Sequence, residues 1–186
     1  MASDEDLLAA YAAGDPNAAR VLMLRLTPAI YGLAVRMLGD KAEAEDVTQE
    51  AMLRLWKIAP DWQAGSAKPS TWLYRVAANL CTDRLRRRRT VAWEEGFDPA
   101  DDAASPAEEM QEKARQIGLQ DALNDLPERQ RQAVVLRHLE GLNNPQIAEI
   151  MEISVEAVES LTARGKRSLA KLLVERKQEL GYTDDG

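Results

Sequence analysis

The stretch STWLYRVAANLCTDRLRRRR, residues 70–89, places an apolar stripe, an aromatic and polar stripe, and a basic end on one predicted helix. The apolar residues recur at helical spacing, so we expect them to be buried. They are Leu73, Val76, Ala77, Leu80, Cys81 and Leu85. A second stripe contains Trp72, Arg75, Asn79 and Arg86, and we expect it to face outward because these residues suit a core poorly.

An aromatic ring beside cationic and amide groups is what unpaired bases need, because stacking tolerates any base and Arg or Asn adds hydrogen bonds. Arg84 and residues 86–89 add five guanidinium groups at the helix end. Their mutual repulsion is tolerable in water or against phosphates. An amphipathic helix with a solvated basic end explains the same residues, so the stretch alone leaves both interpretations open.

The composition predicts an all-α protein. Apolar residues make up 45% of the 186 residues and aromatic residues only 5%, and strand-like runs between hairpin turns are absent. No apolar run reaches membrane-spanning length and the acidic N-terminus is unlike a signal peptide, so we expect a cytoplasmic protein without membrane insertion. The single cysteine, Cys81, excludes an intramolecular disulfide and a thiolate metal cluster. We expect it to be a small core residue rather than a redox sensor.

The net charge of −7 is unevenly distributed and divides the chain into modules. Residues 1–89 and 127–177 each carry +2, whereas residues 90–126 carry −8 and the tail from 178 carries −3. An acidic total therefore does not argue against a nucleic-acid partner. Helical periodicity is absent between residues 90 and 105, which indicates a flexible linker. We expect a helical domain at 1–89, an acidic linker at 90–105, a second helical domain at 106–177 and an acidic tail at 178–186.

The first module is expected to contain helices capped by Ser3, Asp15 and Asp40, with Pro28 kinking or splitting the second helix. The helix from Lys41 to Ala59 carries acidic and amide groups around an exposed leucine on its outer side. These residues are Asp46, Gln49, Glu50 and Leu53. They indicate a docking face for a basic partner helix or, alternatively, a solvated face. A metal site is disfavoured because no paired Glu-x-x-His motif is present.

A polar loop, residues 61–69, joins that helix to the Trp72 helix. Trp62, Ser66 and Lys68 lie in it, and its tip is placed to reach a base that has left the duplex. A simple connection is the alternative.

The second module contains the sharpest local pattern of the chain. We expect Asn144 to cap a short helix that begins at Pro145, and Ser154 to cap a long helix. Ala148, Ile153 and Val158 have the offsets of a helix-turn-helix, whose second helix enters the major groove. Its outward positions include Glu159, Ser160, Ala163, Arg164, Lys166 and Arg167. A helical hairpin in a plain bundle is the alternative.

Three segments, in this order, resemble the extracytoplasmic-function (ECF) branch of the bacterial sigma-70 family, and the resemblance covers nearly the whole chain. They are GDKAEAEDVTQEAMLRLW (39–56), TWLYRVAANLCTDRLRRRR (71–89) and LPERQRQAVVLRHLEGLNNPQIAEIMEIS (126–154). The resemblance implies two helical domains joined by a linker, no catalytic residues, and no cofactor or metal. It also implies core RNA polymerase and promoter DNA as partners, and commonly an anti-sigma factor. We expect the free chain to be a monomer that binds DNA poorly.

The resemblance also implies roles for individual residues. Docking on the clamp helices of core polymerase falls to Asp46, Gln49, Glu50 and Leu53. The residues expected to melt and hold the minus-ten element are Trp62, Ser66, Lys68, Trp72, Arg75 and Asn79. Those expected to bind the phosphates upstream of it are Arg84, Arg86 and Arg87. The helix-turn-helix at 144–167 is expected to read the minus-thirty-five element. The residues that would contact it are Glu159, Ser160, Ala163, Arg164, Lys166 and Arg167.

The chain departs from the family pattern at three places. Glu152 stands where a turn glycine is usual, which predicts a left-handed non-glycine residue or a different turn. Glu159 stands where the family commonly has a basic residue. A carboxylate at this position can accept a hydrogen bond from the amino group of a cytosine. Lys68 and Pro69 stand where an aromatic residue often precedes the melting helix.

Two other classes of protein account for parts of the sequence. A stand-alone helix-turn-helix regulator would need a dimer or an effector pocket, and the sequence offers neither. An enzyme would need reacting groups, but His138 and Cys81 lie beside or within core positions and no glycine-rich phosphate loop is present.

Overall fold

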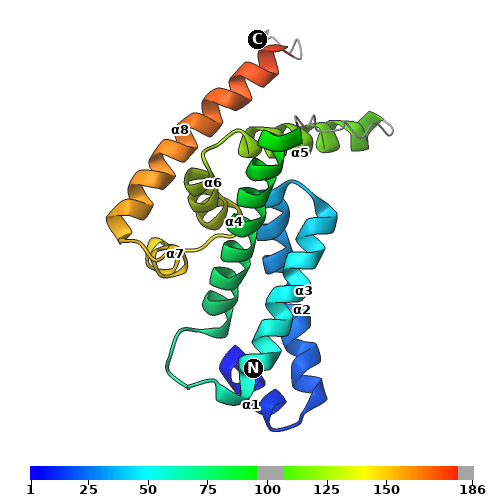
Figure 1. Ribbon diagram of the computed structural model, residues 1–186, viewed down its shortest axis with the longest axis vertical. Helices are drawn as coiled ribbons and strands as arrows, with labels where there is room; N and C mark the ends of the chain where they lie inside the picture. Colours follow the sequence, from blue (N-terminus) through cyan, green and yellow to red (C-terminus); the bar gives the residue numbers. More distant parts are fainter. Residues whose placement is uncertain (96–106, 180–186) are drawn as a thin grey trace.

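A computed structural model describes residues 1–95 and 107–179, and within these ranges the protein is helical with short connections and no strand (Figure 1). The first module contains α1 (Asp4–Ala12), α2 (Pro16–Leu38), α3 (Lys41–Ile58), the 3-10 turn η1 (Ala59–Asp61) and α4 (Pro69–Glu95). The second contains α5 (Ala107–Asn124), α6 (Glu128–Val134), the π-helical segment η2 (Val135–Leu139), α7 (Asn144–Met151) and α8 (Val155–Glu179). The expected all-α class is confirmed.

The helix starts of the first module follow the predicted capping chemistry. The Ser3 side chain and the carboxylate of Asp6 form a reciprocal capping box. Asp15 and Asp40 accept hydrogen bonds from backbone N–H groups at the starts of α2 and α3. Pro28 does not split α2, which is one continuous helix. Leu24, whose carbonyl Pro28 cannot bond, is 70% exposed, so this carbonyl lies on the solvent side of the helix.

Helix α2 is the central helix of the first module. By length and composition alone it is long and apolar enough to cross a membrane, which corrects the expectation that no apolar run reaches that length. Its eight buried residues, among them Leu22, Leu33 and Met37, instead pack in a core shared with α1, α3 and α4. The apolar character of α2 is therefore explained by its place in the bundle.

Helix α4 is longer than the sequence pattern predicts. It continues to Glu95, whereas we expected the linker to begin at residue 90. Residues 90–95, TVAWEE, continue the backbone hydrogen bonding of α4 although they add no apolar stripe. The rest of the predicted linker and the tail from residue 180 lie outside the described residues.

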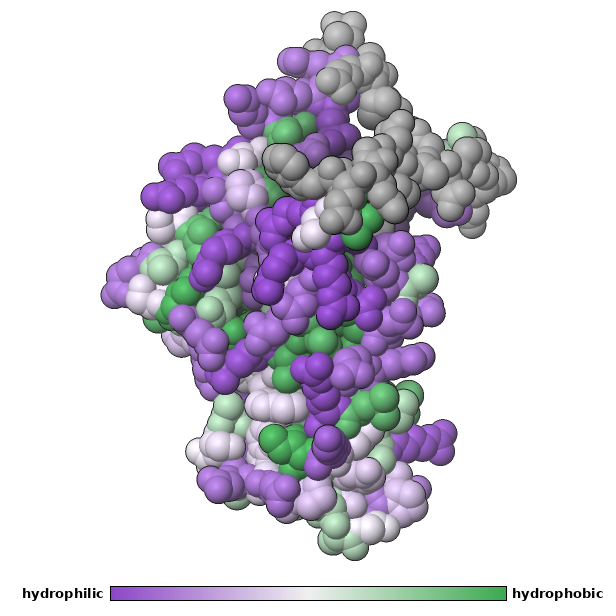
Figure 2. All heavy atoms as spheres, viewed as in Figure 1, coloured by the Kyte–Doolittle hydropathy of each residue, from purple (hydrophilic) through white to green (hydrophobic). Residues whose placement is uncertain are grey.

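The two modules pack against each other, and one cluster of buried side chains runs through both. Leu33, Leu55 and Leu73 contribute to it from the first module, and Leu136 and Ile150 from the second. Helix α7 lies against α4, and α5, α6 and η2 contact α2. Figure 2 shows one face of this assembly, mainly hydrophilic with small apolar patches.

The crossing of α6 and α8 depends on Gly165. A Cβ atom at this position would lie 2.5 Å from Val134 Cγ2 and 3.1 Å from the Gln130 carbonyl oxygen. We expect Gly165→Ala to lower the free energy of unfolding by about 1–3 kcal/mol through overpacking, measured by urea denaturation. Gly118→Ala is the matched control, because a Cβ there meets nothing within 4 Å. It is expected to stabilise α5 by up to about 1 kcal/mol, and an equal loss in both variants would contradict the prediction.

Candidate nucleic-acid and polymerase interface

The four predicted polymerase-docking residues line one open groove of about 420 Å³ between α3 and α4. Leu53 is 62% exposed and is the exposed large apolar residue among the groove's lining residues, which are otherwise mainly charged. Glu50 is oriented by an ion pair with Arg54 at 2.9 Å. Across the groove α4 contributes Arg84 and Arg87. The structure therefore brings the predicted docking face beside two of the predicted phosphate-binding arginines.

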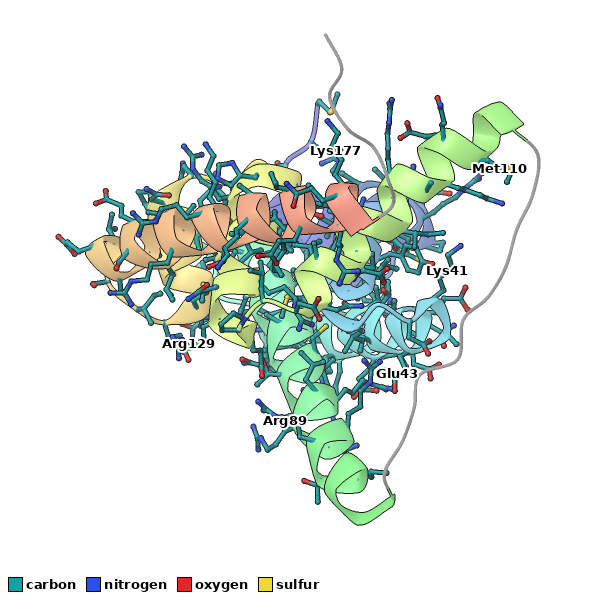
Figure 3. The ribbon with its side chains drawn as sticks, turned by 90° about the horizontal axis from the view of Figure 1, so that it is seen from above. Lys41, Glu43, Arg89, Met110, Arg129 and Lys177 are labelled. Carbon is teal, nitrogen blue, oxygen red and sulfur yellow. The ribbon has the colours of Figure 1, made fainter. Side chains whose placement is uncertain are left out.

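The arginines at the end of α4 differ in orientation: some are exposed, and others contact neighbouring helices. Arg86 is exposed and pairs with Asp83 at 3.1 Å. Arg88 turns inward, donates to the Leu38 carbonyl oxygen at 2.7 Å and pairs with Glu43 of α3. Arg89 pairs with Glu128 of the second module at 3.2 Å. Figure 3 shows Arg89 on the part of α4 that extends past the bundle.

These contacts correct the expectation that the whole arginine run faces water or phosphates. Arg88 lies three residues after Leu85 and seven after Cys81, so it continues the apolar stripe of α4. This spacing was the signal for its inward orientation. Its carboxylate and carbonyl partners satisfy a guanidinium that is only partly exposed. Arg84, Arg86 and Arg87 remain available to a polyanion.

The Trp72 stripe is half-buried rather than fully outward. Trp72 packs edge-on against Trp62, with ring centroids 6.0 Å apart and planes at 88°. The Trp62 indole N–H is buried without a hydrogen-bond partner. Asn79 is exposed, as are Ser66 and Lys68 in the loop before α4. Trp62, Ser66 and Lys68 thus precede α4, whereas Trp72, Arg75 and Asn79 follow one another along its first three turns, and none of these six residues is buried.

Arg75 has contacts that the sequence did not predict. Its Nη2 donates to the Glu149 carbonyl oxygen at 3.1 Å, and its Nη1 lies 4.0 Å from Glu152 Oε1. Both partners belong to the second module, at the end of α7. The guanidinium is therefore turned toward the helix-turn-helix.

The helix-turn-helix is formed by α7 and α8, and its turn contains a left-handed non-glycine residue, one of the two alternatives that the sequence left open. Glu152 adopts the left-handed conformation (φ 56°) and its N–H bonds the Ala148 carbonyl oxygen. The Ser154 hydroxyl caps α8 by accepting from the Ala157 N–H at 3.1 Å. One cap was misplaced: Asn143, not Asn144, caps α7, in a reciprocal pair with Gln146. Pro145 consequently occupies the second helical position.

The outward face of α8 agrees with the predicted pattern. All six predicted minus-thirty-five residues are exposed: Glu159, Ser160, Ala163, Arg164, Lys166 and Arg167. Val158 on the opposite side is fully buried. The start of α8 thus presents a carboxylate and a hydroxyl, and the following turns present three cations, an order that suits base edges first and phosphates next.

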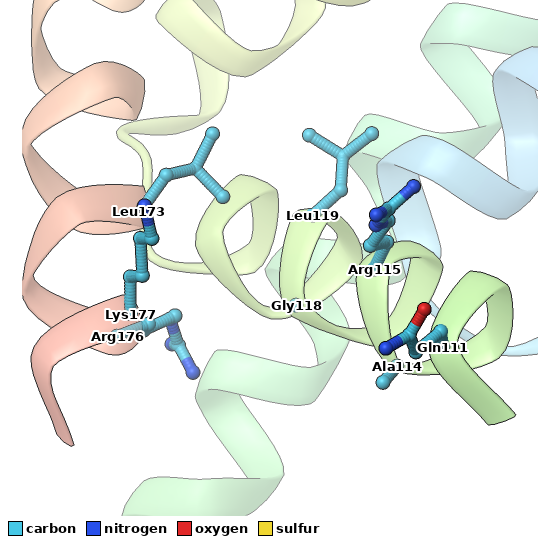
Figure 4. A pocket seen from close by; sticks show the side chains of 8 residues that line it. All are labelled: Gln111, Ala114, Arg115, Gly118, Leu119, Leu173, Arg176 and Lys177. Carbon is cyan, nitrogen blue, oxygen red and sulfur yellow. The ribbon is translucent and has the colours of Figure 1, made fainter. Parts of the chain in front are cut away.

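A second cleft, of about 540 Å³, lies between α5 and α8 and was not predicted. Figure 4 shows Leu119 of α5 and Leu173 of α8 on its two sides, with Arg115 and Arg176 near its ends. Arg176 is paired with Asp121 and Asp125. Leu119, Leu173 and Ala114 form its apolar lining, and Arg115, Arg176 and Lys177 also line it.

Cys81 is a fully buried core residue. Burial raises the pKa of its thiol to about 12, so the reactive thiolate is scarce at neutral pH. We expect the native chain to resist iodoacetamide at pH 8, whereas the urea-unfolded chain is alkylated at the rate of a free cysteine. Mass spectrometry of the quenched reactions measures both rates. Equal rates in the two states would restore Cys81 as a redox-sensor candidate.

A bundle with an aromatic and basic helix, followed by a helix-turn-helix, defines the chain as a two-module helical protein of the helix-turn-helix class. Residues 22–91 match the family model "Sigma-70 region 2" and residues 116–169 match "Sigma-70, region 4". The chain is 34% identical over 155 residues to the ECF RNA polymerase sigma factor SigW of Bacillus subtilis, covering 77% of this chain and 82% of SigW. The chain therefore belongs to the ECF branch of the sigma-70 family, which confirms the resemblance seen in the sequence.

One further relative is longer, and two solved structures share the fold. The chain is 34% identical to the ECF sigma factor SigE of Mycolicibacterium smegmatis, covering 81% of this chain but only 59% of SigE. The structure of CnrH in complex with the cytosolic domain of CnrY matches with a TM-score of 0.70 and 25% identity, over 92% of this chain and 97% of CnrH. The sigma factor RpoE in complex with the anti-sigma factor NepR, from Bartonella quintana, matches with a TM-score of 0.67 and 24% identity, over 83% of this chain and 95% of that chain.

Proposed function

We propose that this chain is a cytoplasmic transcription initiation factor that binds core RNA polymerase and directs it to specific promoters. The observation that carries the proposal is the α3–α4 groove, where Leu53 stands exposed among Asp46, Gln49 and Glu50. An exposed apolar anchor with a charged rim is what a protein-docking site requires. The family of the chain makes core polymerase the partner.

On polymerase, the two modules are proposed to read the two promoter elements together. The exposed residues of α8 contact the minus-thirty-five element. The loop before α4 and the Trp72 stripe hold unpaired minus-ten bases, and Arg84, Arg86 and Arg87 bind phosphates upstream. Base capture offsets the few kcal/mol that unstacking costs. Because polymerase holds both modules at a fixed separation, two weak readers act as one strong reader.

An anti-sigma factor is the proposed regulator of this activity. The similar fold of RpoE was solved with the anti-sigma factor NepR, and that of CnrH with the cytosolic domain of CnrY. The chain also carries an apolar cleft between α5 and α8 that is suited to a protein partner. This function requires no catalytic group, metal or cofactor.

The test is transcription from genomic DNA by purified core polymerase with and without the chain, followed by sequencing of the transcripts. We expect new start sites that share minus-ten and minus-thirty-five motifs only when the chain is present. A labelled promoter from this set should then bind the chain with core polymerase and only weakly without it. Strong sequence-specific binding by the chain alone, with no change in start sites, would instead identify a stand-alone regulator.

A further inference from the structure

The helix-turn-helix carries acidic groups and no basic group up to Ala163. The sequence of residues 144–163, NPQIAEIMEISVEAVESLTA, contains four glutamates, no lysine and no arginine. All four glutamates are exposed: Glu149 on α7, Glu152 in the turn, and Glu156 and Glu159 on α8. The N-terminal residues of a recognition helix are the ones that contact base edges. In this chain that part of α8 is therefore acidic.

The carboxylates nearest the start of α8 differ in what the protein itself offers them. Glu152 lies 4.0 Å from Arg75 Nη1, and Glu156 lies in the first turn of α8, where the helix dipole favours a negative charge. Glu159 lies beyond the first turn and makes no ion pair or side-chain hydrogen bond within residues 1–95 and 107–179. The positions three and four residues before and after it hold no lysine or arginine, and Glu156 at the third position repels it. Folding of the chain therefore gives no reason for a carboxylate at residue 159.

A carboxylate in the major groove distinguishes the bases because it can accept hydrogen bonds but cannot donate them. Guanine presents two acceptors there, and thymine presents an acceptor oxygen beside its methyl group. Adenine presents its amine next to the acceptor N7, whereas cytosine presents its 4-amino group alone. Cytosine is therefore the base that a carboxylate matches best, and guanine and thymine are the bases that it repels.

The neighbours of Glu159 do not make the same distinction. Ser160 has a hydroxyl that both donates and accepts, so it fits an amine or an acceptor atom equally. Ala163, one turn further along, has only a methyl group, and both residues are exposed. The cations of α8 begin at Arg164, where they can bind phosphates of any sequence. The choice among bases at the start of α8 therefore depends mainly on Glu159.

We propose that Glu159 selects a cytosine in the minus-thirty-five element, with its carboxylate accepting a hydrogen bond from the 4-amino group of that base. The proposal rests on the proposed function, because it requires the start of α8 to lie in the major groove of a promoter. The carboxylate also disfavours guanine and thymine by facing their acceptor atoms. Replacing the selected cytosine by thymine is expected to weaken promoter binding by the polymerase complex roughly 5- to 100-fold.

The test selects minus-thirty-five sequences with the full chain bound to core polymerase. A promoter found by transcript sequencing is remade with its minus-thirty-five element randomised, and the molecules that the complex retains are sequenced. We expect one position at which cytosine is strongly preferred. Glu159→Ala should lose the preference at that position, and Glu159→Gln should shift it toward adenine, whose amine and N7 an amide matches.

The matched control is Glu175→Gln near the other end of α8. Glu175 is an exposed carboxylate that lies 4.0 Å from Lys171, and it follows Glu159 by 16 residues on the same helix. Removing a negative charge at either position favours binding to any DNA, but this effect does not depend on the base. Glu175→Gln should therefore leave the selected sequences unchanged, and the base preference reports contact rather than charge.

Two results would overturn the proposal. The first is an identical set of selected sequences for the unsubstituted chain and Glu159→Ala, when circular dichroism shows both to be folded. The second is the same change of base preference in Glu175→Gln as in Glu159→Gln. A complex that selects no motif and starts no new transcripts would refute the proposed function and this inference with it. A complex that selects a motif independent of residue 159 would refute this inference alone.

Discussion

Leu53→Asp is expected to weaken binding of the chain to core RNA polymerase by roughly 30-fold to several hundred-fold, equivalent to about 2–4 kcal/mol. The leucine is 62% exposed and lines the α3–α4 groove, so we expect it to be the apolar anchor of the docking face. A carboxylate there would lose the apolar contact with the partner and would add a desolvation cost on docking. Fluorescence anisotropy of the labelled chain titrated with core polymerase measures the change.

The control for this variant is Leu24→Asp on α2. Leu24 is 70% exposed and lies outside the groove, so the substitution has the same chemistry on a different face. Both variants should unfold within about 0.5 kcal/mol of the unsubstituted chain, because exposed positions contribute little to stability. If Leu53→Asp binds polymerase normally, or if both variants lose binding equally, the groove is not the docking site.

The features that could be predicted from the sequence are those set by local chemistry. Ser3, Asp15 and Asp40 cap helices because their side chains reach N–H groups two or three residues away. At Glu152 the sequence left two alternatives, a left-handed residue or a different turn, and the structure has the left-handed residue. Asn143 was missed as a cap because Asn144 beside it has the same chemistry.

The features that could not be predicted depend on contacts between distant residues. Arg131 donates a hydrogen bond to the carbonyl oxygen of Met37, 94 residues away in the chain. The periodicity of the sequence gives no sign of such a contact. In the sequence Glu140 looks like an ordinary exposed residue at a helix end. In the structure it is partly buried, and burial raises the pKa of its carboxyl above the usual range. The extent of α4 past residue 89 was missed because the sequence TVAWEE, residues 90–95, does not continue the apolar periodicity of the helix. Periodicity therefore identified the modules but not how they pack.

The second large effect is expected from replacing Trp72, Arg75 and Asn79 together by alanine. Base stacking on an aromatic ring is worth about 1–3 kcal/mol per base, and Arg75 and Asn79 add hydrogen bonds to the captured strand. The triple variant should lose at least about 2 kcal/mol of strand capture, or roughly 30-fold in open-complex formation. Permanganate reactivity of unpaired thymines at the minus-ten element measures this loss.

Two measurements separate capture from stability and from docking. The triple variant loses the packing of Trp72 on Trp62, so its unfolding must be measured, and the assay run at a temperature where it stays folded. Its binding to core polymerase should be unchanged, because the α3 side of the groove keeps its residues. On a template already unpaired at the minus-ten element, the cost of strand separation is removed, so any remaining defect reports base capture alone. A variant that opens intact duplex promoters at the normal rate would show that the Trp72 stripe does not trap the strand, and melting would then have to be assigned to the loop before α4.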